Sequence, residues 1–325
     1  MIVKKPPGEF ALIARLCAKL PRRAGTVLGP GDDCAILAPS RKPQLITIDS
    51  MVESVHFKLE WITPRMLGAR ALTVNLSDIA AMGGAPTSCV VNLAIRPGLD
   101  AAFFDRLYAG MAAAATAAGV DIVGGNITRA SELAITIALL GDAGAGIMRR
   151  DSARPGDAIY VTGTIGDAAA GLRILNGQLD ARGAARKFLV ERFLNPTARI
   201  EAGRRLARLR PVPAAIDVSD GLWQDLGHIL ERSGGGAELD PAAVPLSPAY
   251  RAAVGEDPEL ALTGGDDYEM LFCMRPRLSD AALTDRLGVA VHRIGTIVSG
   301  KGAALSGRNR REAARLSGWD QLRRG

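Results

Sequence analysis

The sequence has 325 residues, of which 48% are hydrophobic and 4% aromatic, and its formal net charge is +6. Such a chain is too long for one compact core and too apolar to be disordered, so we expect two folded domains. The positive charge gathers in arginine runs without interleaved aromatic residues or a docking motif. This pattern favours a solvated basic surface and predicts no nucleic-acid partner.

The cysteines lie far apart and form no CxxC pair: Cys17, Cys34, Cys89 and Cys273. This spacing is typical of a cytoplasmic protein and unlike a zinc site or a disulfide framework. No apolar stretch follows the lysines and prolines of the first ten residues, so no signal peptide is expected. No apolar run is long enough to cross a bilayer, and no membrane partner is expected.

The first half of the chain mixes helix-like and strand-like segments, which predicts an α+β domain over residues 1–148. Apolar spacing predicts helices at 10–20, 64–82 and 101–119, and strands at 34–37, 44–48, 88–95 and 132–140. Asp49 is expected at the end of a strand, and Gly124-Gly125-Asn126 is expected to form a turn.

A charged, proline-containing stretch at 149–156 is typical of a boundary, so an α/β domain is expected over 149–325. Strands are predicted at 158–162, 214–218, 269–274 and 289–294, and helices at 167–175 and 219–232. The turn at 163–166 could hold an anion at a helix N-terminus. Residues 295–301 match G-x-x-x-x-G-K but lack the following Ser/Thr and helix, so no P-loop is expected.

Aspartates fall where the chain bends. Asp33 lies in a glycine-flanked loop, Asp217 and Asp220 flank a strand-to-helix turn, and Asp266 and Asp267 follow a glycine pair. A single aspartate in a turn commonly bonds its own backbone, but the set as a whole favours a functional site.

Asp78 lies inside the predicted helix at 64–82, in a stripe of small residues that includes Gly68 and Ala71. A buried carboxylate needs a cation, which here is either a metal or an arginine. The chain has three histidines and scattered cysteines, so a hard ion fits better than zinc. Because magnesium takes only one or two protein carboxylates, this many acids, with hydroxyls such as Ser50 and Ser219 nearby, predict several Mg²⁺ ions around a phosphate-rich substrate.

Segments in chain order resemble the thiamine-monophosphate kinase family, within the superfamily of aminoimidazole ribonucleotide synthetase and selenophosphate synthetase. They are 31–35, 49–57, 75–84, 124–126, 150–157, 195–197, 217–221 and 264–269. Three positions depart from the family pattern. Asn126 stands where the family often has an aspartate, Asp266 replaces a glutamate, and Ser54 replaces a common glycine.

The resemblance implies a homodimer in which the N-terminal α+β domains share a β-barrel, each followed by a C-terminal α/β domain. It implies in-line transfer of the γ-phosphoryl group of ATP onto thiamine monophosphate, giving thiamine diphosphate. By matching positions, the metal ligands would be Asp33, Asp49, Asp78, Asp217 and Asp220. ATP would contact Tyr108, Gly125, Asn126, Arg150 and Ser219, and the thiamine phosphate would contact His56, Asp266 and Trp319.

An ionised phosphate is its own nucleophile, so no general base is expected among the side chains. Two alternatives remain open from the sequence. One is another ATP-dependent synthetase of the same superfamily, and the other is a non-catalytic nucleotide-binding regulator that kept the fold.

Overall fold

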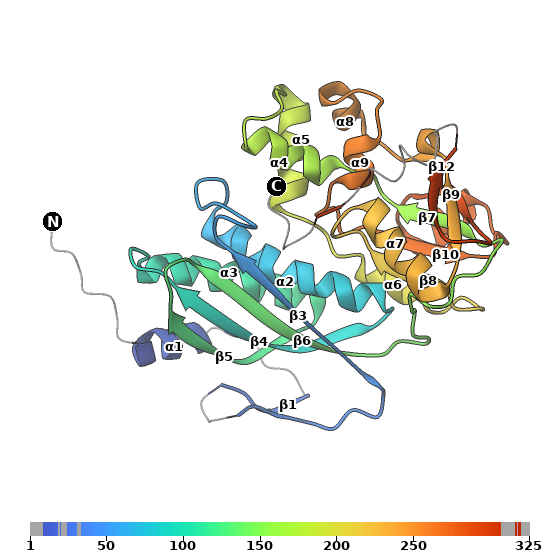
Figure 1. Ribbon diagram of the computed structural model, residues 1–325. Helices are drawn as coiled ribbons and strands as arrows, with labels where there is room; N and C mark the ends of the chain where they lie inside the picture. The colour runs from blue at the N-terminus through green and yellow to red at the C-terminus, as the bar shows by residue number, and fades with distance from the viewer. Residues whose placement is uncertain are drawn as a thin grey trace. The chain divides into compact units, whose positions relative to one another are not determined.

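The computed structural model describes residues 9–18, 20, 25–30, 34–306, 316, 318 and 319. The chain forms two compact units (Figure 1). The first consists of Met1–Ile79 and Ala85–Ala143, and the second of Ala80–Gly84 and Gly144–Gly325. The division therefore falls between residues 143 and 144. A domain boundary between 148 and 149 stays a prediction.

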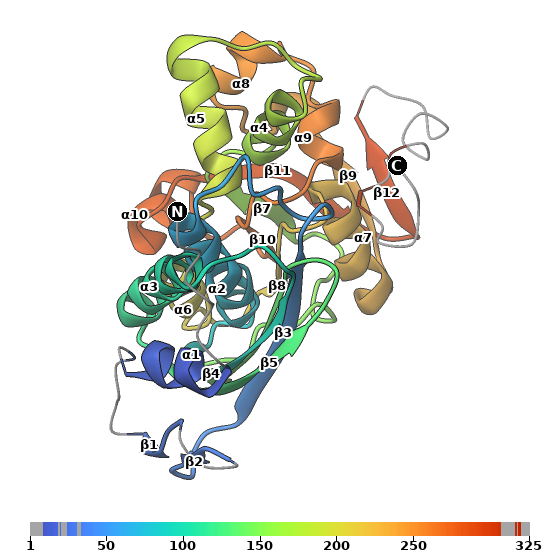
Figure 2. The same cartoon turned by 90° about the vertical axis from the view of Figure 1, so that its left-hand side faces the viewer.

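The first unit is built on an open four-stranded sheet in the order β3-β6-β4-β5. Strands β4 and β5 pair in parallel, and the other two pairings are antiparallel. The strands are β3 (Gln44–Val52), β4 (Ala85–Ile95), β5 (Asp121–Arg129) and β6 (Ala134–Asp142). Helices α2 (Pro64–Ala81) and α3 (Ala101–Ala118) cover one face of this sheet, as Figures 1 and 2 show. Helix α1 (Glu9–Cys17) and the short strands β1 (Thr26–Leu28) and β2 (Ile36–Leu37) precede it.

Helices α2 and α3 approach each other closely where their residues are small. A Cβ added at Gly68 of α2 would lie 1.9 Å from the carbonyl oxygen of Leu107 in α3. The small-residue stripe that includes Gly68 and Ala71 therefore receives a helix of the same unit.

Two expectations about the first unit are wrong. Strand β3 continues to Val52, so Asp49 lies inside the strand and not at its end. Gly124-Gly125-Asn126 lies within β5 and does not form a turn. The glycine is needed there because a Cβ at Gly125 would lie 2.0 Å from the carbonyl oxygen of Val91 in the paired strand.

The second unit is built on a six-stranded sheet in the order β12-β9-β11-β7-β10-β8. Its pairings are antiparallel except for β12 with β9. The strands are β7 (Ala158–Thr162), β8 (Ala214–Asp217), β9 (Gly236–Leu239), β10 (Met270–Met274), β11 (Val291–Val298) and β12 (Gly302–Leu305). The second unit thus has a mixed sheet rather than the parallel sheet typical of doubly wound α/β proteins.

Both faces of this sheet are buried. Ile159 and Leu271 belong to a core with helices α4 (Asp167–Leu175) and α7 (Leu222–Ser233), whereas Tyr160 and Phe272 belong to a core on the other face with α6 (Ile200–Leu206) and α10 (Asp280–Leu287). The remaining helical segments are α5 (Gly183–Leu194), η1 (Pro241–Ala243), α8 (Pro248–Ala253) and α9 (Glu259–Thr263). None of the helices in the described residues is long and apolar enough to span a membrane.

Candidate active site

In the first unit, strand β3 and helix α2 bring two of the predicted acids to the same side of the sheet. The hydroxyl of Thr47 donates a hydrogen bond to the Asp78 carboxylate, at 2.5 Å. The backbone N–H of Asp49 donates to the side-chain oxygen of Asn75, one helical turn before Asp78. Because side chains alternate along a strand, Asp49 projects from the same face of β3 as Thr47.

Ser50 follows Asp49 in the strand and projects from the opposite face. Its hydroxyl lies 2.7 Å from that of Thr136 in β6. Thr136 is opposite Asn92 of β4, and the amide of Asn126 in β5 donates to the side-chain oxygen of Asn92 at 2.9 Å. The structure therefore places Ser50 and Asn126 in one polar row across the sheet, and it does not bring Ser50 together with Asp49 and Asp78.

His56 lies just after β3, in a tight turn. Its Nδ1 accepts the backbone N–H of Val52 at 3.0 Å, so the neutral ring carries its proton on Nε2. Ser54 in this turn has φ of 68°, a left-handed conformation that glycine adopts more easily than serine. The turn thus fixes His56 as a hydrogen-bond donor.

Tyr108 lies on α3, and Gly125 lies on β5. Burial raises the pKa of the Tyr108 phenol, with smaller contributions from the thiols of Cys17 and Cys89. The phenol therefore stays protonated at neutral pH and is a hydrogen-bond donor. The predicted ligand Asp33 lies outside the described residues.

In the second unit, three chain segments meet around the turn at 217–221. The backbone N–H of Asp266 donates to the carbonyl of Ser219 at 2.8 Å, and that of Trp319 donates to the carbonyl of Asp220 at 2.9 Å. A Cβ at Gly265 would lie 2.1 Å from the Ser219 oxygen, so this approach requires glycine. Ser219, Asp220, Asp266 and Trp319 are thereby brought together, although they lie in segments far apart in the sequence.

Asp225 was not predicted from the sequence, yet it holds the turn. Its Oδ2 accepts the backbone N–H groups of Ser219 at 3.0 Å and Asp220 at 3.2 Å, and the residue is 1% exposed. Burial, with the like charges of Asp217 and Asp220, raises the pKa of Asp225 to about 8. A signal was present in the sequence, because Asp225 interrupts the apolar face of α7 formed by Leu222, Leu226 and Ile229.

Asp220, Asp225 and His228 each offer one ligand atom, and these atoms lie within 4.8 Å of one another. Burial raises the pKa of Asp220, and the charge of Asp266 raises it further. His228, Gln224 and Arg150 act in the opposite direction. The cluster is therefore acidic and partly buried, which is the environment in which a carboxylate gains from a bound cation.

Asp266 and Asp267 have different roles although they are adjacent. The hydroxyl of Tyr268 donates to Asp266 at 2.9 Å. Asp267 is 1% exposed, and its two oxygens accept the backbone N–H groups of Gly166 at 2.7 Å and Ala168 at 3.2 Å. The helix N-terminus at 163–166, considered above as an anion site, is therefore filled by the chain's own carboxylate.

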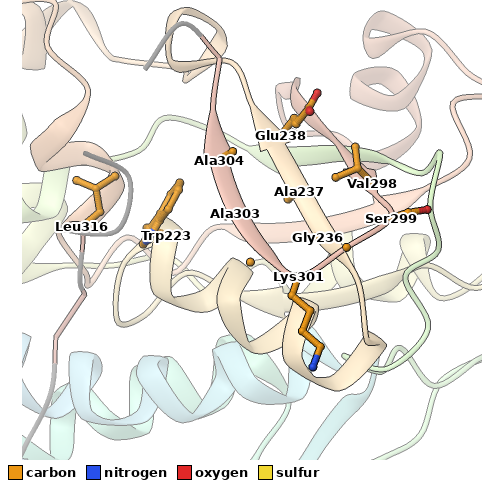
Figure 3. A pocket seen from close by; sticks show the side chains of 12 residues that line it. Trp223, Gly236, Ala237, Glu238, Val298, Ser299, Lys301, Ala303, Ala304 and Leu316 are labelled. Atoms are coloured by element: carbon orange, nitrogen blue, oxygen red, sulfur yellow. The ribbon is translucent and has the colours of Figure 1, made fainter. Parts of the chain in front are cut away.

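The G-x-x-x-x-G-K segment crosses from β11 to β12, so a strand follows it and not a helix. It borders a pocket of about 470 Å³ with Trp223, Glu238 and Leu316. Figure 3 shows Lys301 projecting at the turn before β12, at the end of the pocket away from Glu238. A P-loop requires a helix whose N-terminus faces the phosphates, so this segment is not a P-loop.

Two family descriptions match the chain. Residues 31–143 match the AIR synthase related protein, N-terminal domain, and residues 154–307 match the corresponding C-terminal domain. The chain is 41% identical over 289 residues to the thiamine-monophosphate kinase of Escherichia coli K12, covering 86% of each chain. It is 40% identical over 287 residues to that of Salmonella typhimurium LT2, again with 86% of each chain covered.

Solved structures show the same relationship. The thiamine-monophosphate kinase of Stenotrophomonas maltophilia K279a is 38% identical, with a TM-score of 0.83 over 93% of this chain and 97% of that one. AaThiL complexed with AMPPCP and TMP is 32% identical, with a TM-score of 0.77 over 97% of each chain. With this identity over most of its length, the chain belongs to the thiamine-monophosphate kinase family.

Proposed function

We propose that the protein transfers the γ-phosphoryl group of ATP in line onto thiamine monophosphate, giving thiamine diphosphate, and that the reaction depends on magnesium. The observation that carries the proposal is the acid-rich turn at 217–221, held by backbone hydrogen bonds to the segments of Asp266 and Trp319. Support for the substrates comes from AaThiL, which is complexed with AMPPCP and TMP.

The donor set fits magnesium. In the first unit, Thr47, Asp49 and Asp78 lie on the same side of the sheet, and every donor atom there is a hard oxygen. The proposed magnesium ligands are Asp33, Asp49, Asp78, Asp217 and Asp220. Bound magnesium would neutralise phosphate charge and align the reacting phosphates.

The chain's own side chains would bind and orient the two substrates. Arg150 and Ser219, with Tyr108, Gly125 and Asn126, are proposed to contact ATP. His56 presents an Nε2–H donor, which suits a phosphate oxygen and not the role of a base. Asp266 and Trp319 are proposed to contact the thiamine phosphate, and Trp319 is 45% exposed, which suits stacking on an aromatic ligand.

No general base enters this mechanism. The acceptor is a phosphate monoester, whose second pKa is near 6, so its nucleophilic oxygen is already ionised at neutral pH. Free thiamine offers a hydroxyl instead, which would have to lose a proton during transfer. The proposed site should therefore discriminate strongly between the phosphate ester and the free alcohol.

The proposal includes a homodimer formed through the first unit. The face of its sheet not covered by α2 and α3 carries an apolar patch, in which Ile46 is 74% exposed, Ile48 64% and Val90 40%. Ile46 is opposite Leu140, and Ile48 is opposite Ala138, so the patch is continuous across neighbouring strands. Such a patch is typical of a protein interface, and pairing two of these sheets would form the shared barrel.

The alternatives differ in what they predict. HypE structures, at 20–24% identity, share the fold, and this likeness shows the fold alone. A non-catalytic regulator would be expected to have lost acids, yet the aspartates at 49, 78, 217 and 220 are all present, and Asn126 is the neutral exception.

The test is an ADP-release assay with ATP, magnesium and one acceptor at a time. We expect turnover with thiamine monophosphate and none with free thiamine, and no turnover in excess chelator. Asp220→Asn should lower the turnover number strongly while the melting temperature changes little. Turnover of free thiamine with thiamine monophosphate inert would refute the assignment.

For the dimer, light scattering should show that Ile48→Lys yields a monomer and that Phe188→Lys, an exposed apolar position of the second unit, does not.

A further inference from the structure

The second unit has a pocket of about 700 Å³ that belongs to none of the segments assigned above. It lies where α6 and the loop after it meet the end of β10 and helix α10. Its lining residues, which we call the arginine pocket, are Glu201, Arg205, Arg208, Leu209, Arg210, Met274, Arg277, Leu278 and Arg286. Its volume is within the range of sites that bind small molecules.

The arginine pocket has a large excess of positive charge. Its lining contains five arginines and one glutamate, a formal excess of four positive charges. The single acid is already engaged, because Arg205 donates to Glu201 at 2.9 Å. Within the described residues, the guanidinium groups of Arg208, Arg277 and Arg286 form no ion pair with a carboxylate. Like charges gathered in a concave surface favour binding of an anion.

Two of the arginines are held in place by backbone carbonyls, and Arg210 forms no ion pair within the described residues, so its charge is retained. Arg210 donates to the backbone carbonyls of Ala207, Leu209 and Ala145 at 2.8–3.0 Å. Arg205 donates to the carbonyl of Arg286 at 3.3 Å, which connects α6 to α10 across the pocket. Such fixed guanidinium groups lose less conformational entropy when a ligand binds.

We propose that the arginine pocket binds a phosphate-rich small anion carrying a di- or triphosphate group. Guanidinium forks match the geometry of phosphate oxygens and bind them through paired, charge-assisted hydrogen bonds. Several such forks in one pocket fit several phosphate groups better than a single carboxylate. Leu209, Met274 and Leu278 provide an apolar part of the lining that an organic portion of the ligand would contact. The proposal does not depend on the kinase reaction.

The test is a calorimetric titration of inorganic tripolyphosphate into the full-length protein with excess EDTA. Without magnesium, the proposed active site holds phosphates only through its own side chains, such as Arg150. The contribution of the arginine pocket is therefore read from variants of the pocket itself. We expect saturable binding that weakens as salt is added. Arg208→Gln combined with Arg277→Gln should weaken it by at least about tenfold, since each lost charge-assisted hydrogen bond costs about that much. Both residues are exposed, and unchanged melting temperatures would show that the variant folds.

Arg204→Gln is the matched control, because Arg204 lies on the same helix, is exposed and does not line the pocket. It should change the affinity by less than about threefold, as expected for a surface charge.

Parallel titrations with AMPPCP identify the source of the ligand. Tighter binding than that of tripolyphosphate indicates a nucleotide, and equal binding indicates the polyphosphate group alone. Absence of saturable binding, equal loss in Arg204→Gln, or binding of a short single-stranded RNA without tripolyphosphate binding would overturn the proposal.

Discussion

The hydroxyl of Thr47 donates a hydrogen bond to the carboxylate of Asp78, joining the first strand of the four-stranded sheet to the helix that packs on it. Thr47 and Asp49 project from the same face of β3, so this hydroxyl lies on the side of the proposed magnesium ligands. Ser50, the hydroxyl predicted from the sequence, projects from the other face and contacts Thr136. The two hydroxyls therefore make a matched pair for mutagenesis.

The first prediction is that Thr47→Val raises the magnesium concentration needed for half-maximal activity, whereas Ser50→Ala leaves it nearly unchanged. Valine has the shape of threonine without the hydroxyl, so Asp78 loses one of its hydrogen bonds and the magnesium site loses a fixed carboxylate. Loss of a hydrogen bond to a charged group corresponds to about a tenfold effect. Initial rates across a magnesium titration measure it. If both variants needed the same higher magnesium concentration, the position of the hydroxyl on one face of β3 or the other would not decide its effect on the magnesium site.

The second prediction concerns Asp225, which we expect to position the turn at 217–221 without contacting substrate. Asp225→Ala removes the acceptor for the N–H groups of Ser219 and Asp220, so the turnover number should fall by at least about tenfold. Asp225→Asn keeps one oxygen for the same two donors and should retain most activity. If Asp225 instead held a metal, the Asn variant would fail like the Ala variant and would require more magnesium. Glu231→Ala, exposed on the same helix, is the control.

The candidate site residues could be selected from the sequence because they fall in short motifs with distinctive neighbours, and their roles stay predictions. Helix α4 was predicted with its exact bounds, since a turn with two glycines precedes it and its apolar spacing is regular. The direction of side chains in β3 could not be predicted, because the strand was expected to end at Ile48 and its continuation to Val52 depends on pairing with β6. The hydrogen bonds of Asp267 were also inaccessible, since they join segments that only the fold brings together. Those of Asp225 are local, and the break that Asp225 makes in the apolar face of α7 was the available signal.

The third prediction is that Glu269→Ala destabilises the second unit strongly. Glu269 is fully buried and accepts hydrogen bonds from Arg199 at 2.7 Å, from Arg192 at 3.0 Å and from Thr162 at 2.6 Å. Its loss would leave the largely buried guanidinium group of Arg199 without its carboxylate, and Arg192 with only the longer pair to Asp167 at 3.9 Å. Breaking a buried pair in this way costs about 3–5 kcal/mol of unfolding free energy. Urea unfolding followed by circular dichroism measures the change. Glu256→Ala, which removes the exposed pair with Arg251, should cost about 1 kcal/mol or less. Equal losses of unfolding free energy in Glu269→Ala and Glu256→Ala would contradict the prediction that the buried ion pairs stabilise the protein more than the exposed one.

The fourth prediction is a pH dependence of stability caused by Asp267. Burial, with the charge of Asp167, raises the pKa of Asp267 to about 8, against the hydrogen bonds from Gly166 and Ala168 and the charge of Arg192. In the unfolded chain an aspartate has a pKa of about 3.9. The folded state therefore binds one more proton than the unfolded state between about pH 4 and pH 8, and the free energy of unfolding contributed by Asp267 is lost as pH rises through this range.

Asp267→Asn removes this dependence, because an amide does not titrate. At pH 5 the variant should be less stable than the wild type, since one of the two backbone N–H groups loses its acceptor, at a cost of about 1–3 kcal/mol. As pH rises to 8 the difference should shrink, because only the wild type loses the contribution of the protonated carboxyl. Urea unfolding of both proteins at pH 5, 6, 7 and 8 measures the difference in unfolding free energy. The contributions of the other acidic residues cancel in this difference because both proteins contain them. Parallel stability curves would mean that Asp267 is ionised in the folded protein throughout this range, with the N–H groups of α4 sufficient to hold its charge.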